Sequence, residues 1–179
     1  MINIAPGTYA IDPSHSEVGF SVRHAGIAKV RGTFSDFEGT VEVAESGAAS
    51  TADVTVQLAS VDTRSPQRDE HLRSADFFDV ENSPTMIFTT TAVEVEDEEE
   101  FVLKGHLTLN GVTKPVEIEA EYTGAATDPF GQQRVGFSGK TVLNRKDFGL
   151  TWNAALETGG VLVSDKVSII LEVSAIKQV

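Results

Sequence analysis

Apolar and polar side chains alternate along almost the whole chain, and this alternation limits its fold more than any other feature. In the clearest segment, Val116, Ile118 and Ala120 are set against Glu117 and Glu119. A period of two places successive side chains on opposite faces of a β-strand, so each such segment has one face to bury. The same pattern occurs in segments 17–24, 53–58, 101–109, 135–143 and 167–173, and segments 31–43 and 85–96 add two further expected strands. We therefore expect an all-β chain of about eight long strands, preceded by a short one at about residues 8–11.

Short turns separate the expected strands. Asn110-Gly111 and the segments 45–47, 128–131 and 158–160 carry residues that favour tight turns. Connections this short make neighbouring strands antiparallel, because a parallel pair needs a long crossover. Closing the sheet removes its edges, which predicts an eight-stranded antiparallel β-barrel whose interior either fills with side chains or holds one small ligand. No linker divides the chain, so we expect a single domain over residues 1–179.

Two segments depart from the alternation. Between Val30 and Gly39, the glycines and the spacing of two phenylalanines do not fit a straight strand, which predicts a bend or bulge. Ser65 followed by Pro66 is typical of a helix N-cap and first helical position, and the run to about Ala75 is long enough for a short helix. Such an insertion between two strands can cover an open end, so we expect the helix at about 66–75 to form a lid there.

The composition excludes several classes of function. A net charge of −13 and a pI near 4.6 argue against nucleic acid or an anionic membrane surface as partner, because both attract cationic proteins. The chain has no cysteine, no close metal-ligand spacing among its 4 histidines, and no P-loop, G-x-S-x-G or dinucleotide fingerprint, so we expect no metal and no cofactor.

The sequence also bears on where the protein is located. No apolar run is long enough to span a bilayer, so we expect a protein that is not integral to the membrane. The first seven residues lack the positive and apolar regions of a secretory signal. We therefore expect a cytoplasmic protein, or a periplasmic or secreted one if a leader was removed.

His24 is the first candidate for a polar group inside the barrel. It shares a strand face with Val18, Phe20 and Val22, so we expect its side chain to point inward. Two interpretations follow. His24 is either a hydrogen-bonded core residue or an anchor for a ligand head group, because an apolar cavity orients its ligand with a few placed polar groups.

The expected helix gathers further charged side chains. Asp69 and Arg73 are four residues apart and can pair on its surface, while Leu72 faces the barrel. Arg68 and His71 then either belong to a salt-bridge network that fixes the lid or face the barrel mouth. At the mouth, a guanidinium can hold a pyrophosphate or carboxylate head group through two hydrogen bonds.

Aromatic residues accompany both charged segments. Phe77 and Phe78 follow the expected helix and either pack the lid or touch the ligand. Arg145 and Asp147 are expected to form a structural pair, with Trp152 packing nearby.

Short motifs occur in a fixed order along the chain: Asp12-Pro13-Ser14-His15-Ser16, Gly32-Thr33-Phe34, Arg68-Asp69-Glu70-His71-Leu72, Phe77-Phe78, Pro84 with Phe88, Gly105-His106-Leu107-Thr108, Gly111-Val112-Thr113-Lys114-Pro115-Val116 and Arg145-Lys146-Asp147-Phe148-Gly149-Leu150. With them, the chain resembles the YceI-like family of bacterial polyisoprenoid-binding proteins over essentially its full length. The resemblance implies an extended, lipocalin-like, eight-stranded antiparallel barrel with an elongated apolar tunnel for a long isoprenoid or related amphiphile. That architecture agrees with the strand count.

We therefore expect a protein that is not an enzyme and that carries or sequesters an isoprenoid lipid, such as a polyprenyl phosphate or quinone precursor. Two alternatives stay open: an enzyme using His24 or His71 as general base in the same cavity, and a stress-related interaction protein that forms a homodimer. The expected ligand-binding residues are Phe20, Val22, His24, Phe34, Arg68, His71, Phe77, Phe78, Phe88 and Trp152.

Overall fold

The structure, a computed structural model, describes residues 2–179. Its strands are β1 Gly7–Ile11, β2 Glu17–His24, β3 Ala28–Phe34, β4 Phe37–Val43, β5 Thr51–Gln57, β6 Val61–Asp62, β7 Thr85–Val95, β8 Glu100–Leu109, β9 Val112–Thr127, β10 Gln133–Asn144 and β11 Val163–Lys177. One α-helix, α1 Pro66–Arg73, and the short 3₁₀ helices η1 Pro13–His15, η2 Gly47–Ala49, η3 Leu58–Ser60 and η4 Arg145–Phe148 complete the fold.

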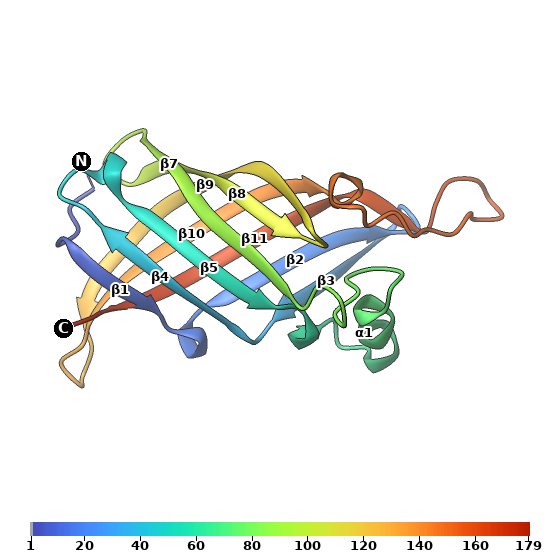
Figure 1. The fold of residues 1–179 in the computed structure, drawn as a ribbon, viewed down its shortest axis with the longest axis horizontal. Coiled ribbons are helices and arrows are strands. Elements are labelled where there is room, and N and C mark those ends of the chain that lie inside the picture. The colour runs from blue at the N-terminus through green and yellow to red at the C-terminus, as the bar shows by residue number, and fades with distance from the viewer. Residues whose placement is uncertain (1) are drawn as a thin grey trace.

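The strands form one antiparallel sheet that closes on itself (Figure 1). The closed ring runs β1-β4-β5-β7-β8-β9-β10-β11, and the pairing of Tyr9 with Lys177 joins β11 back to β1. The sheet continues from β11 through β2, β3 and β6 at the other end of the barrel. The prediction of an eight-stranded antiparallel barrel with one short helix is confirmed.

Three of the long strands are each broken into two labelled segments. β1 and β2 are separated by η1, β5 and β6 by η3, and β3 and β4 by Ser35 and Asp36. The last two breaks are tied together, because the Asp36 amide donates to the Ser60 hydroxyl at 3.1 Å and the Gln57 amide donates to the Asp36 carbonyl at 2.8 Å. The bend expected between Val30 and Gly39 therefore lies at Ser35 and Asp36.

The helix α1 begins where expected and ends slightly early. The Ser65 hydroxyl accepts from the Arg68 amide, and Pro66 occupies the first turn. The helix ends at Arg73 rather than near residue 75, because Ser74 is extended and both its amide and its hydroxyl donate to the His71 carbonyl. Figure 1 shows α1 beside the end of β3, away from both chain termini.

Side chains fill the interior of the barrel at the α1 end. The rings of Phe20 and Phe34 lie 5.6 Å apart, and that of Phe78 lies 5.8 Å from Phe34. The Phe20 ring lies across Gly32, where an added Cβ would come within 2.4 Å of it. We call Phe20, Phe34 and Phe78 the aromatic plug. Further buried residues at this end are Leu58, Val61, Leu109, Phe148 and Leu150.

Two arginines hold the barrel together at opposite ends. Arg134 donates to Asp12 and Asp128 at 2.8 Å each, and this hydrogen bonding holds the pKa of both carboxyls below its usual range. Buried Arg145 donates to the backbone carbonyls of residues 150, 152, 163 and 164, and burial lowers the pKa of its guanidinium. The expected Arg145–Asp147 pair is wrong, because the acid nearest to Arg145 is Asp165, at 4.0 Å.

Candidate binding cavity

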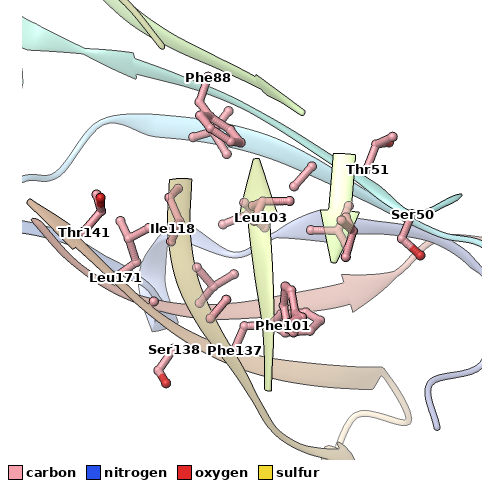
Figure 2. A pocket seen from close by; sticks show the side chains of 18 of the residues that line it. Ser50, Thr51, Phe88, Phe101, Leu103, Ile118, Phe137, Ser138, Thr141 and Leu171 are labelled. Atoms are coloured by element: carbon pink, nitrogen blue, oxygen red, sulfur yellow. The ribbon is translucent and has the colours of Figure 1, made fainter. Parts of the chain in front are cut away.

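An apolar cavity with a volume of about 240 Å³ occupies the rest of the barrel. The alternating inward positions of the strands supply its wall, which includes Val54, Phe88, Phe101, Leu103, Leu107, Ile118, Phe137 and Leu171. Figure 2 shows Phe88 on one side of this space and Ile118, Phe137 and Leu171 on the other. The interior is therefore part packed core and part open cavity.

Small residues on neighbouring strands make room for this space. Phe101, Ala120 and Gly139 are aligned across β8, β9 and β10 by the strand register, and Leu171 of β11 pairs with Gly139. Ala120 and Gly139 both line the cavity. A row of this kind leaves open the volume that larger side chains would fill.

Few polar groups line the cavity. Ser50 and Thr51 lie at one end of it and Thr141 at the other, as Figure 2 shows. The Ser50 hydroxyl accepts from the Ala44 amide at 3.0 Å, and the Thr141 hydroxyl donates to the Glu117 carbonyl at 2.7 Å. Among the lining residues of the described chain, Glu45 is the only one with a charged side chain. Apolar contact is thus the main interaction that this surface offers.

The mouth of the cavity lies at the η2 end, opposite α1. Ile2, Ile4, Glu45 and Gly47 line it there together with Val95, the last residue of β7. A Cβ added at Gly47 would lie 3.3 Å from the Val95 side chain, so η2 packs closely against this strand end. At the other end, the aromatic plug closes the barrel, so a long chain has to enter from the η2 side.

A second, polar cleft lies on the barrel wall between β9 and β10. Their pairing ends at Lys140 and Glu119, beyond which the two strands separate. Lys114, Glu117, Asn144 and Asp147 line the cleft, which shares Val116, Thr141 and Leu143 with the cavity. A cleft with polar walls therefore lies beside the inner part of the apolar cavity.

Of the residues expected to bind ligand, Phe88 lines the cavity. Phe20, Phe34 and Phe78 form the plug, and Val22 is a half-buried residue paired with Val30 and Val167. The expectation that His24 points inward is wrong, because His24 is exposed at the end of β2 and is not among the residues that line the cavity. Direct contact of these residues with ligand stays a prediction.

The charged side chains of α1 make local contacts instead of lining the cavity. Arg68 donates to the hydroxyl and carbonyl of Thr63 at 2.8 and 2.7 Å. The expected Asp69–Arg73 pair is wrong: Asp69 accepts from the amide and hydroxyl of Thr63, and Arg73 donates to the carbonyls of residues 59 and 61. These bonds tie α1 to the segment around β6.

His71 belongs to an aromatic cluster at the same end. Its ring lies edge-on to Trp152 and Phe77, with centroid distances of 4.7 and 5.1 Å, and Nε2 lies 2.8 Å from a carboxyl oxygen of Asp76. The cluster packs α1 against the segment that follows η4. His71, Phe77 and Trp152 are not among the residues that line the cavity.

Sequence reasoning missed the polar residues at the mouth. Glu45 was part of a turn signal, and Ser50 and Thr51 lie where the next strand starts. The alternation of apolar and polar residues does not distinguish a turn at the mouth of a cavity from a turn that lies in solvent. In residues 2–179 no cluster of three or more His, Cys, Asp or Glu is placed to hold a metal ion, and no helix there is long and apolar enough to cross a membrane.

A closed antiparallel barrel with a deep apolar cavity defines a class of small-ligand-binding barrels. The model of the YceI-like domain matches residues 9–175, and the chain belongs to this family. It is 42% identical over 173 residues to a UPF0312 protein of Ectopseudomonas mendocina, covering 95% of this chain and 87% of that protein. The YCEI protein of Campylobacter jejuni has a similar structure, with a TM-score of 0.76, 31% identity and full coverage of both chains.

A more distant structure shares the fold alone. It is a polyisoprenoid binding domain from Saccharophagus degradans, with a TM-score of 0.73 and 14% identity, covering 95% of this chain and 98% of that one.

Proposed function

We propose that the protein binds the apolar chain of an isoprenoid lipid in the barrel cavity, for transport, storage or sequestration, without chemical conversion. The observation that carries the proposal is the cavity itself, which is deep, apolar and closed at the α1 end by the aromatic plug. The fold shared with a polyisoprenoid binding domain supports the same ligand class.

The cavity wall suits a hydrocarbon chain. Burying apolar carbon contributes about 0.8 kcal/mol per CH₂, so a five-carbon isoprene unit gains up to about 4 kcal/mol before ordering is deducted. A methyl-branched chain also fits a wall of branched residues such as Val54, Ile118 and Leu171. Affinity should therefore rise with chain length until the cavity is full.

The mouth favours an uncharged head group over a phosphate. A chain that enters tail first leaves its head near Glu45, and the acidic residues between Glu94 and Glu100 connect β7 and β8 at the same end. Lys104 at this end is already paired with Glu94 at 2.6 Å. A dianionic head placed here would be repelled, whereas a quinone or an alcohol would not. Of the two cargoes expected from sequence, the quinone precursor fits the mouth and the polyprenyl phosphate does not.

The enzyme alternative loses its catalytic base in this arrangement. His24 is exposed at the end of β2, His71 packs against Trp152, and neither residue lines the cavity. A general base has to reach the proton it removes, directly or through one water. Neither histidine faces the space where a substrate would lie.

A matched ligand series tests the proposal. We expect a fluorescence competition assay to show binding of a prenyl alcohol, with weaker binding of the phosphate of the same chain. Glu45→Lys should improve binding of the phosphate, whereas Glu172→Lys, an equal charge change on the outside of β11, should not. Failure of every prenyl compound to bind would refute the proposed function. The cytoplasmic location and the homodimer stay predictions, to be measured by cell fractionation and sedimentation.

A further inference from the structure

The β2–β3 hairpin projects an apolar tip at the α1 end of the molecule. Its turn has left-handed backbone at Ala25 and Gly26, and it leaves Ile27 84% exposed. The loop before β11 lies against this turn, because the Ala25 amide donates to the Leu162 carbonyl at 2.7 Å. That loop presents Val161, which is 51% exposed. Two aliphatic side chains thus stand in solvent on neighbouring segments.

The same hairpin is cationic in a strongly acidic protein. Residues 18–35 contain no Asp or Glu, although the chain has 27 of them, and they include Arg23, Lys29 and Arg31. Arg23 pairs with Lys29 in the strand register, and Arg31 pairs with Ser21 on the same face. All three cations are exposed, and within the described residues none forms an ion pair.

The neighbouring segments add few acidic side chains: on β6, exposed Asp62 pairs with Thr33 of β3 and is followed by exposed Arg64. Lys166 lies exposed on β11, the strand that pairs with β2. Asp165 is engaged by Lys146 at 3.3 Å, and Glu157 is the one acid of the loop 151–162. The tip therefore has a local excess of positive charge behind its exposed aliphatic residues.

We propose that this tip, which consists of Ile27, Val161, Arg23, Lys29 and Arg31, docks on an anionic lipid surface. Aliphatic side chains that enter the interface, backed by cations that meet anionic head groups, are the combination used by peripheral membrane proteins. Two protruding residues form no groove, and a stable protein partner would bury about 800 Å² on each side, so a lipid surface is the occupant that fits. This proposal does not depend on the ligand in the cavity.

The net charge of −13 does not forbid this contact. Exposed charges are screened over a Debye length of about 8 Å at physiological ionic strength. The acidic residues between Glu94 and Glu100 lie at the opposite end of the barrel, many times that distance along its strands. Charge near the surface, rather than the total, decides the interaction, so the sequence expectation that excluded anionic membranes holds for the other faces of the barrel.

Vesicle flotation tests the proposal with the full chain. We expect the protein to float with an equal mixture of phosphatidylcholine and phosphatidylglycerol, not with phosphatidylcholine alone, and to be released by high salt. A variant with Arg23→Gln, Lys29→Gln and Arg31→Gln should bind about 10²-fold more weakly, because each cation near an anionic surface contributes about fivefold. Ile27→Ser should weaken binding about tenfold.

Phe130→Ser is the matched control. Phe130 is 89% exposed in the turn between β9 and β10, at the far end of the barrel and next to Asp128. This variant should bind vesicles as the wild type does. Equal binding to both vesicle types, no binding to either, or an unchanged affinity of the triple variant would each overturn the proposal. Thermal melting of each variant checks that it is folded.

Discussion

Replacing Ala120 by phenylalanine should block the cavity in the middle of its wall. Ala120 faces inward between Phe101 and Gly139 in the strand register, where the small side chains leave space. A ring there displaces at least one isoprene unit of a bound chain. At about 0.8 kcal/mol per CH₂, the lost contact is up to about 4 kcal/mol, or about 2 kcal/mol after ordering is deducted. Affinity should fall between about 30-fold and about 10³-fold.

The assay is displacement of a fluorescent prenyl probe, measured over a series of chain lengths. Because the new ring fills empty apolar space, the ligand-free variant should melt no lower than the wild type. Thr89→Phe places the same ring on the outer face of β7, next to inward-facing Phe88, and should leave binding unchanged. An Ala120→Phe protein that is folded and binds long prenyl chains like the wild type would refute the assignment of the cavity as binding site.

Three further predictions concern the stability of the barrel. Arg145→Met should lower the free energy of unfolding by about 3–5 kcal/mol in urea titrations, because four backbone carbonyls lose a buried donor; a loss near zero would contradict this role. Gly105→Ala should cost about 1–3 kcal/mol, because its Cβ would lie 2.4 Å from the Phe88 ring, and unchanged melting would contradict that packing. Hydrogen bonding to Arg134 lowers the pKa of Asp12, so its stabilisation is present at neutral pH and is lost as the pH falls below about 4. The Asp12→Asn variant should have a lower free energy of unfolding at pH 7 and should lose less of it on acidification. An equal loss of stability in the acid titrations of both proteins would contradict this role of Asp12.

The period of two was enough to predict the barrel but not where its strands break. Each long strand has an alternating segment, and Gly32 and Gly39 indicated the bend before β4. The breaks at η1 and η3 depend on contacts between segments distant in sequence, such as the Asp36 amide on the Ser60 hydroxyl. Local patterns contain no information on such pairs.

Alternation also predicts which side chains face inward, but not how far along the barrel they lie. Phe20 and Phe88 both occupy inward positions, yet Phe20 packs in the plug and Phe88 lines the cavity. Position along the axis depends on strand register and tilt, which are properties of the whole sheet. His24 shows the same limit: it continues the inward alternation of β2, but it is the last residue of the strand and is exposed there.

The spacing of residues along a helix did not predict the contacts of α1, for a related reason. Asp69 and Arg73 have the spacing of a surface pair, but the chain before the helix offers a buried partner to Asp69 and backbone carbonyls to Arg73. Thr63 presents an amide and a hydroxyl to Asp69, and the carbonyls of residues 59 and 61 accept from Arg73. A hydrogen bond to a buried backbone group satisfies a polar atom that would otherwise be unpaired, which outweighs a solvent-exposed ion pair.

A crystal structure of the protein saturated with a long-chain prenyl alcohol tests the central claim most directly. We expect continuous density for the chain inside the barrel, in contact with Phe88, Leu103 and Ile118. The hydroxyl should lie near Glu45 and Ser50, with the tail ending before the aromatic plug. A chain bound on the outer surface or in the cleft between β9 and β10, with the cavity empty, would contradict it.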